Sequence, residues 1–342
     1  MPVTDPHPKL QALHPEEPAP PAAARPLTPA EAQALGAALT RSIRRALMGK
    51  DALIEQTLCA LAAGGHLLIE DVPGVGKTTL AQALARSLEL SFSRVQFTSD
   101  LLPGDITGVS VYDQRTGGFV FKPGPLFAQL VLADEINRTT PRTQSCLLEA
   151  MSEGQVSVDG LPRPLPRPFL VLATQNPHEH AGTYPLPESQ LDRFLMRLSV
   201  GYPDAATERE LLLGGGTQGA LALLVPVAGA HEVRRLQATV PGVKVAPELA
   251  DYVLALVAAT RSSPLVQLGA SPRGALALLA AAKARALLRG RGFVEPDDVK
   301  ALAVPCLAHR VALAGRGGAG EADRLASERV VRELCESVAA PE

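Results

Sequence analysis

Residues 71–79 combine glycines, a lysine and threonines in an order that suits phosphate binding. They lie between an apolar run that predicts a buried strand and a stretch that predicts a helix, which is the context expected of a phosphate loop. Gly74 and Gly76 allow backbone N–H groups to turn inward, and the helix that follows points its positive end at the anion. Lys77 can reach the β and γ oxygens of a nucleotide, and the hydroxyl of Thr78 can hold Mg²⁺.

Two positions of this loop narrow the choice of ligand. The first position, usually glycine, is Asp71, so the motif departs from the common pattern while it keeps the Gly-Lys-Thr part. A dinucleotide-binding loop would need a third glycine where Thr79 stands, and Lys77 argues against a cofactor that offers only a pyrophosphate. A chance glycine turn before a helix is the alternative for this loop taken alone.

A second group of chemistry-bearing residues follows the apolar run 130–133, where Asp134 and Glu135 come directly after the predicted strand. Carboxylates in this position suit a metal site at the carboxyl edge of a parallel sheet. Asp134 would orient the Mg²⁺ shell, and Glu135 would polarise the attacking water. An acidic helix N-cap explains the pair equally well in isolation, but the phosphate loop favours the catalytic interpretation.

A third polar residue, Asn176, follows the apolar run 169–173. Its amide both donates and accepts hydrogen bonds, so it can serve the γ-phosphate or the attacking water. An Asx-type turn before Pro177 is an alternative that the local sequence leaves open.

Apolar runs that alternate with helical patterns surround these three sites. The alternation predicts a parallel sheet with helices on both faces. Strands are predicted at residues 66–70, 93–97, 130–133, 169–173 and 195–200, with helices at 28–47, 51–63 and 77–88. The first helix begins with a capping box, Thr28 to Glu31. Two β-hairpins, at residues 109–121 and within 155–168, are predicted as insertions.

After residue 204 the strand pattern ends and helices follow. They are predicted at residues 231–239, 247–261, 272–288, 296–309 and 323–338, three of them with proline at N1. Residues 1–26 are rich in Pro and Ala and are predicted to be disordered. The predicted organisation is a tail at 1–27, an α/β nucleotide-binding domain at 28–210, a linker at 211–220 and a helical lid domain at 221–342.

The composition excludes several classes of protein. Of 342 residues, 46% are hydrophobic and 20% charged, which is ordinary for a globular chain of one or two domains. A net charge of −2 gives the chain as a whole no basic signature for nucleic acid. The four cysteines are far apart in apolar stretches and predict neither zinc nor disulfides. No apolar run predicts a membrane span or a signal peptide, so a cytoplasmic protein is expected.

The order of these elements resembles that of the AAA+ ATPases: phosphate loop, acidic strand, asparagine strand and helical lid. The chain is similar in particular to the MoxR family, over residues 48–310. The segments that carry this resemblance are 70–78, 100–108, 133–138, 173–177, 190–194, 201–204 and 269–274. The resemblance implies a parallel five-stranded P-loop NTPase core between helices, with hairpin insertions and a C-terminal all-α lid.

The resemblance also implies roles for individual residues. Lys77 and Thr78 match the Walker A positions, Asp134 and Glu135 the Walker B positions, and Asn176 sensor 1. Met48 and Gly49 lie where relatives line the adenine pocket. The residues expected to bind ATP and Mg²⁺ are Met48, Gly49, Pro73, Gly74, Val75, Gly76, Lys77, Thr78, Thr79 and Asp134, with Thr78 and Asp134 as metal residues.

Two arginines complete the catalytic set that the resemblance implies. Arg193 matches the arginine finger, which reaches the nucleotide of a neighbouring subunit, and Arg273 matches sensor 2 in the lid of the same subunit. Arg193 also stands next to Asp192 and could form a surface ion pair with it, and Arg197 is close enough to be the finger instead. Arg273 falls in the first turn of a predicted helix, where the dipole disfavours a cation unless a phosphate is present.

For function, the resemblance implies Mg²⁺-dependent ATP hydrolysis in a hexameric ring that remodels or matures a client protein, or inserts its metal or cofactor. It also implies a partner with a von Willebrand A domain, and the hairpins would face the central channel or its mouth. A nucleotide-gated scaffold with little turnover is one alternative. A magnesium-chelatase-like or nucleic-acid-acting motor is another, although the net charge argues against nucleic acid as a ligand.

Overall fold

A five-stranded parallel sheet forms the centre of the computed structural model, which describes residues 25–176, 183–213, 217–315 and 320–341. The strand order is β2-β5-β8-β1-β9, and each neighbouring pair is parallel. The strands are β1 (Leu67–Glu70), β2 (Phe92–Gln96), β5 (Leu130–Asp134), β8 (Leu170–Gln175) and β9 (Met196–Leu198). Every residue of β1, β5 and β8 is buried, because these three strands occupy the middle of a sheet that is covered on both faces.

Helices on the two faces of the sheet build two separate clusters of buried side chains. Successive side chains of a strand point to opposite faces, so Leu67 and Ile69 join one cluster and Leu68 joins the other. The first cluster contains α1 (Pro29–Arg44), α2 (Asp51–Ala62) and α3 (Lys77–Ser87), and the second contains α5 (Pro141–Glu153). The predicted capping box is confirmed, since Glu31 N–H donates to Thr28 Oγ1 at 3.2 Å and Thr28 N–H to the Glu31 carboxylate at 2.7 Å.

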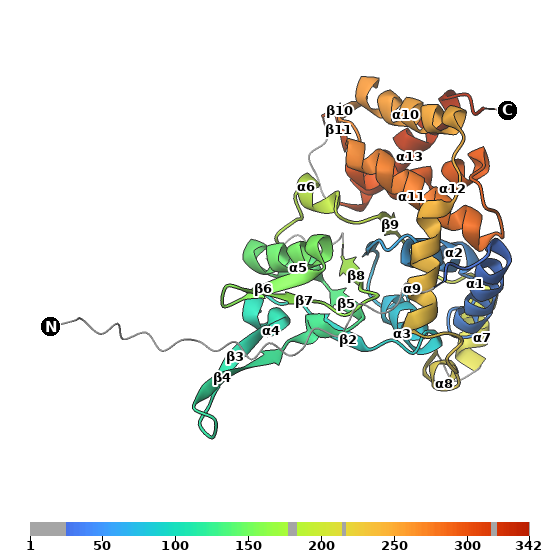
Figure 1. Cartoon of the computed structure of the whole chain (residues 1–342). Coiled ribbons are helices and arrows are strands. Elements are labelled where there is room, and N and C mark those ends of the chain that lie inside the picture. Colours follow the sequence, from blue (N-terminus) through green and yellow to red (C-terminus); the bar gives the residue numbers. More distant parts are fainter. Residues whose placement is uncertain (1–24, 177–182, 214–216, 316–319, 342) are drawn as a thin grey trace.

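Both predicted hairpins are present as two-stranded antiparallel units. One consists of β3 (Gly108–Asp113) and β4 (Gly118–Pro123), and the other of β6 (Gln155–Val158) and β7 (Leu161–Pro164). The β3–β4 hairpin projects from the body of the molecule (Figure 1). Gly108 is required at its base, because a Cβ there would lie 2.3 Å from the carbonyl oxygen of Lys122.

The C-terminal helices gather on the side of the molecule away from that hairpin (Figure 1). They are α9 (Ala230–Thr239), α10 (Pro247–Ser262), α11 (Pro272–Leu288), α12 (Pro296–Leu307) and α13 (Glu321–Ser337). Proline stands at the start of α10, α11 and α12, as the sequence predicts. Helix α11 packs closely on α1, since a Cβ on Gly36 would come within 2.9 Å of the Leu288 side chain.

Some elements were not predicted from the sequence. They are the helices α4 (Pro103–Thr107), α5, α6 (Glu188–Leu191), α7 (Ala205–Leu213) and α8 (Thr217–Ala222), and a small sheet of β10 (Val266–Leu268) and β11 (Ala312–Leu313). Helix α8 begins within the stretch predicted to be a linker. The predicted disordered tail, apart from residues 25–27, lies outside the described residues.

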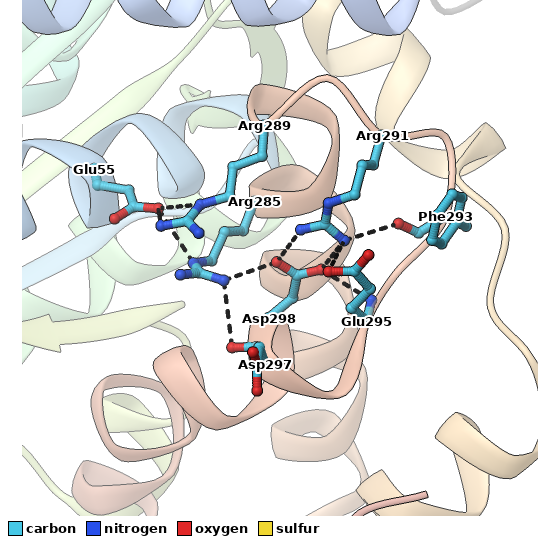
Figure 2. A network of polar contacts seen from close by, with 8 residues as sticks. All are labelled: Glu55, Arg285, Arg289, Arg291, Phe293, Glu295, Asp297 and Asp298. Atoms are coloured by element: carbon cyan, nitrogen blue, oxygen red, sulfur yellow. Dashed lines mark hydrogen bonds and ion pairs between the residues drawn. The ribbon is translucent and has the colours of Figure 1, made fainter. Parts of the chain in front are cut away.

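A network of charged side chains joins the C-terminal helices to the sheet-covering helix α2 (Figure 2). Glu55 of α2 accepts from Arg285 and Arg289 of α11, at 3.2 and 3.0 Å. Asp298 in the first turn of α12 is fully buried, and its carboxylate receives Arg285 and, in a bidentate pair, Arg291, all at 2.8 Å. Each arginine of the network therefore has a carboxylate partner.

Candidate nucleotide site

The loop between β1 and α3 has the backbone shape that phosphate binding requires. Gly74 and Gly76 have φ angles of +87° and +108°, a left-handed conformation that glycine adopts without penalty. Gly76 is the N-cap of α3, so the free N–H groups of the first turn face the loop. A Cβ on Gly74 would meet nothing within 4 Å, so the backbone conformation, and not crowding, requires glycine there.

Lys77 bends back across this loop. Its Nζ donates to the carbonyl oxygen of Asp71 at 2.7 Å. Burial lowers the pKa of the Lys77 amine, while the nearby carboxylates of Asp71, Asp134 and Glu135 act in the opposite direction. The lysine therefore lies within electrostatic reach of both acidic residues at the end of β5, as a phosphate- and metal-binding site needs.

Asp71, the residue at the usual glycine position, ties the loop to the chain that follows β9. Its carboxylate accepts hydrogen bonds from Ser199 Oγ at 2.8 Å and from the Gly201 N–H at 2.6 Å. It also accepts from the N–H of Val72 at 2.9 Å. The departure from the common motif thus has a structural role at the base of the loop.

Asp134 is buried at the carboxyl end of β5, and both of its oxygens are engaged. Thr174 of β8 donates to Oδ1 at 2.6 Å. Arg94 of β2 donates to Oδ2 through Nη2 at 2.6 Å and through Nε at 3.2 Å. The two neighbouring strands therefore orient the carboxylate that would hold a metal.

Glu135 is held by contacts from three directions. Its φ of +58° is rare for a residue with a side chain and marks a strained position directly after the strand. The Glu135 N–H donates to Thr174 Oγ1 at 2.9 Å. Its carboxylate accepts from Gln96 of β2 at 2.9 Å and pairs with Arg138 at 3.1 Å.

Asn176 completes the group at the carboxyl edge of the sheet. It follows β8, which lies between β1 and β5, and it is buried. The order of the strands therefore places Asn176 between the phosphate loop and the acidic pair. Pro177, on which the alternative of an Asx-type turn depends, lies outside the described residues.

The segment expected at the adenine pocket lies beside the same edge. Gly49 has a φ of +70°, and a Cβ there would lie 3.1 Å from Thr207 Oγ1. Lys50 Nζ donates to the carbonyl of Tyr202 at 2.7 Å. Tyr202 follows Gly201, whose N–H is bound by Asp71 of the phosphate loop. The bond from Lys50 to Tyr202 therefore places residues 48–50 beside this loop.

Arg193 lies at the opposite, amino edge of the sheet. It precedes β9, and the Leu195 N–H donates to the carbonyl of His66, just before β1. The four residues of β1 separate this edge from the phosphate loop by about 13 Å. The Arg193 guanidinium donates to the Leu148 carbonyl at 2.6 Å and to Ser152 Oγ at 3.0 Å, both on α5, and is not paired with Asp192.

Arg273 is exposed in the first turn of α11, near the same edge as Arg193. Ser271, the N-cap of the same helix, donates to the carboxylate of Asp192 at 3.0 Å, so the turn that carries Arg273 lies beside the segment that carries Arg193. Burial lowers the pKa of the nearby His66 to about 4, and the charge of Arg273 acts in the same direction. This position differs from the one expected beside the phosphates of the same subunit. The expectation came from the resemblance to the AAA+ ATPases, since the sequence itself does not determine the edge of the sheet on which the C-terminal helices pack.

Arg197, the alternative to Arg193, is largely covered within its own chain, with 10% of its side chain exposed. Its guanidinium lies 3.4 Å from the Glu70 carboxylate at the end of β1 and donates to Ser327 Oγ of α13 at 3.1 Å. Burial raises the pKa of Glu70, and the positive charge of Arg197 opposes that rise. Arg197 is therefore not exposed for contact with a neighbouring subunit.

Three polar residues of the site were not found by sequence reasoning: Arg94, Gln96 and Thr174. They orient Asp134 and Glu135 from the strands on either side of β5. Arg94 and Gln96 fall within a predicted strand, and Thr174 directly follows another, so the sequence predicts their positions on or next to strands. It does not predict that they bond to Asp134 and Glu135, because that depends on which strands flank β5.

Comparisons with known proteins identify a family for this chain. A family model described as "ATPase family associated with various cellular activities (AAA)" matches residues 66–196, and one described as "AAA lid domain" matches residues 258–334. YeaC, an uncharacterised protein of Bacillus subtilis, is 48% identical over 87% of this chain and 92% of its own length. The protein named Chaperone MoxR1 of Mycobacterium tuberculosis is 42% identical over 88% of this chain and 81% of its own.

A solved structure shares the fold over nearly the whole chain. It is a protein of Cytophaga hutchinsonii described as an ATPase, with a TM-score of 0.82 and 34% identity. The match covers 92% of this chain and 97% of the other. Separately, none of the helices in the described part of the chain combines the length and the apolar character that crossing a membrane requires.

Proposed function

The chain belongs to the MoxR family of AAA+ ATPases, and from this premise we propose that it binds ATP with Mg²⁺ and hydrolyses the nucleotide in an oligomeric ring. One observation carries the proposal. Lys77, Asp134, Glu135 and Asn176 meet at one edge of the sheet, while Arg193 and Arg273 lie at the opposite edge. A single chain thus has the nucleotide-binding half of a site at one edge and the arginines at the other.

Each side chain of the first edge has a distinct task. The loop N–H groups and Lys77 bind the phosphates, and Thr78 and Asp134 are the residues that would hold Mg²⁺, which neutralises developing charge on the phosphoryl oxygens when it is bound. Glu135 accepts a proton from the attacking water, and Asn176 orients that water or the γ-phosphate. The observed donors to Asp134 and Glu135 prearrange both carboxylates for these tasks.

The arginines of the opposite edge serve the site of a neighbouring subunit. Guanidinium groups match phosphoryl oxygens in geometry and charge. We assign this role to Arg193 and, because it lies near the same edge, to Arg273 as well. Arg193 must first exchange its bonds to Leu148 and Ser152 for bonds to phosphate, so assembly of the ring and completion of the site coincide.

The work driven by hydrolysis is remodelling or maturation of a client protein, including insertion of its metal or cofactor. This part of the proposal rests on the name of the Mycobacterium tuberculosis relative, Chaperone MoxR1, and on the projecting β3–β4 hairpin. A hexameric ring and a partner with a von Willebrand A domain belong to the same proposal.

ATP hydrolysis per subunit, measured against protein concentration, tests the proposal. The rate per subunit should rise with concentration for the unaltered chain and should vanish in Glu135→Gln. A matched control is Glu153→Gln, which removes an exposed carboxylate from the end of α5 and should leave the rate unchanged. A rate that does not depend on concentration and is equal in Glu135→Gln would favour the nucleotide-gated scaffold instead.

A further inference from the structure

The carboxylate of Asp192 connects the segment that carries Arg193 to the helix that carries Arg273. Ser271 Oγ donates to Asp192 Oδ2 at 3.0 Å, and Arg310 Nε donates to Oδ1 at 2.7 Å. Asp192 is the C-cap residue of α6, so the chain on which Arg193 stands is bonded to the C-terminal helices one residue before the arginine. Both carboxylate oxygens are used in this connection.

Ser271 is the N-cap of α11, and its hydroxyl group makes two hydrogen bonds. Its oxygen accepts from the Gly274 N–H at 3.2 Å, which begins the helix, and its single proton is donated to Asp192. Arg273 follows two residues later in the same helical turn. The hydroxyl of Ser271 therefore links the position of that turn directly to Asp192.

Arg310 fixes the other side of the junction. It is buried, and its guanidinium donates to the carbonyls of Asp192 at 3.2 Å, Phe194 at 2.6 Å and Leu195 at 3.1 Å. A Cβ on Gly274 would lie 3.0 Å from Arg310 Cδ, so the glycine leaves room for the arginine to pass beneath α11. The guanidinium therefore binds backbone carbonyls on both sides of Arg193, and these bonds hold the segment that carries Arg193 against the C-terminal helices.

We infer that Asp192, Ser271 and Arg310 are positioning residues that hold Arg193 and Arg273 in one fixed arrangement, so that the two arginines reach the same phosphate group of a neighbouring subunit together. The inference rests on the proposed function, in which both arginines act on that neighbour. The three positioning residues act through Arg193 and Arg273, because their hydrogen bonds go to one another and to the backbone beside Arg193. Two cations from different parts of the chain can act on one phosphoryl group only when their separation is fixed, because small errors in position cost large factors in rate.

Mixing of subunits tests this inference, because it shows which half of a shared site a variant has lost. Glu135→Gln subunits lack the catalytic carboxylate but keep intact arginines. Arg193→Ala subunits have the reverse defect. When these two inactive variants are mixed, rings should regain activity at interfaces where each supplies what the other lacks.

Ser271→Ala is the variant of interest. Alone it should lose about 10-fold in ATP hydrolysis, less than the roughly 100-fold that a 1 Å misplacement can cost, because Arg310 still holds the segment. Mixed with Glu135→Gln it should regain activity, since Glu135→Gln supplies correctly placed arginines to its intact loop. Mixed with Arg193→Ala it should gain nothing beyond its residual rate, because both variants have lost the same half of the site. Binding of a non-hydrolysable ATP analogue should stay within about threefold of the unaltered chain, a change of less than about 1 kcal/mol.

Two matched variants separate this role from simple loss of a helix cap. Thr28→Ala removes an N-cap of the same kind from α1 and should keep full activity at a temperature where both proteins are folded. Ser271→Thr keeps a hydroxyl and should restore activity. The inference is wrong if Ser271→Ala is fully active, is rescued equally by both partners, or is rescued by neither. If Glu135→Gln and Arg193→Ala fail to rescue each other, the proposed shared site is wrong, and the inference fails with it.

Discussion

At the scale of single residues, Asp71 does what a glycine in its place cannot do. Its carboxylate accepts from Ser199, Gly201 and Val72, and its carbonyl accepts from Lys77. The same residue therefore holds the start of the loop, the chain after β9 and Lys77, to which we assign phosphate binding. A loop built with glycine at this point would have to obtain that rigidity elsewhere.

Replacing Asp71 with Asn should weaken both the fold and nucleotide binding. The amide has the same size, but in one orientation its NH₂ group opposes the Gly201 N–H and the Ser199 hydroxyl, and in the other it opposes the Val72 N–H. Hydrogen bonds to a charged group contribute about 1.5–3 kcal/mol, so the free energy of unfolding should fall by about 2 kcal/mol. Urea unfolding and titration with an ATP analogue measure the two effects. Ser199→Ala, which removes one donor, should cost about half as much. An Asp71→Asn protein with unchanged stability and affinity would contradict this account.

The sequence was sufficient to predict the positions of site residues that depend only on the strand and turn in which they stand. The positions of Lys77, Asp134 and Glu135 follow from a buried strand, a glycine turn and an abrupt change to acidic residues. The side chains that orient the acidic pair from β2 and β8 could not be matched to it, because that requires knowing which strands flank β5. The edge on which Arg273 lies was also beyond reach, since it depends on how α11 packs against α1 and α2.

At the scale of elements, the C-terminal helices are attached to the rest of the chain by buried charge as well as by apolar packing. Asp298 is the centre of this attachment, with Arg285 and Arg291 on its carboxylate and the Glu295 N–H donating at 2.9 Å. Burial alone would raise the pKa of Asp298, but the hydrogen bonds from Arg291 and the Glu295 backbone outweigh it, and the pKa lies below 3.8. The carboxylate is therefore ionised in the folded chain at neutral pH.

Replacing Asp298 with Asn should lower the free energy of unfolding by about 3–5 kcal/mol, because two arginines lose a buried partner. Since the pKa of Asp298 is lower in the folded chain than in the unfolded one, its contribution is fully present above pH 3.8 and is lost as the pH falls through the folded pKa. The difference between the two proteins in urea unfolding should accordingly shrink below about pH 4. Glu55→Gln is the control, since its partly exposed pairs should be worth no more than about 1 kcal/mol. Equal losses in both variants would show that burial does not decide the effect.

Prediction of elements from sequence was most accurate where caps and prolines mark the ends. Helix α11 has the predicted bounds, and α10 and α12 begin at the predicted prolines. Helix α5 was missed although Pro141 stands at its first position, because its first turns are polar and its apolar residues begin only at Cys146. The β10–β11 pair has only three and two residues and joins segments more than about 40 positions apart, so no local pattern could indicate it.

At the scale of the whole molecule, the β3–β4 hairpin presents apolar side chains to solvent far from the C-terminal helices (Figure 1). Phe119 is 73% exposed and Tyr112 54%, and their rings meet edge to face at 5.5 Å. Phe121, two residues nearer the base of the hairpin on the same face, packs against Phe127 and beneath the guanidinium of Arg163. The base of this face thus supports the fold, while its outer part, with Phe119 and Tyr112, is not used by the fold.

Replacing Phe119 with Ser should leave the fold and basal ATP hydrolysis intact but reduce stimulation of hydrolysis by an unfolded protein such as casein. Surface substitutions of this kind change the free energy of unfolding by about 0.5 kcal/mol or less. Phe121→Ala is the matched control, because it should cost about 2 kcal/mol by removing packing at the base of the hairpin. The prediction fails if casein stimulates Phe119→Ser as strongly as the unaltered chain.

The cluster of buried side chains that contains β1 and α1–α3 continues without a break into α10, α11 and α12. On heating, the two matched family regions should therefore absorb heat in one calorimetric transition, and a nucleotide bound at the loop should raise the melting temperature of the lid as well. A gene truncated after the sheet would encode a polypeptide whose α1 and α2 expose the surface that α11 covers, and it would tend to aggregate. On this prediction the lid belongs to the folding unit, so evolutionary variation is expected on its surface and not in the side chains that it shares with α1 and α2.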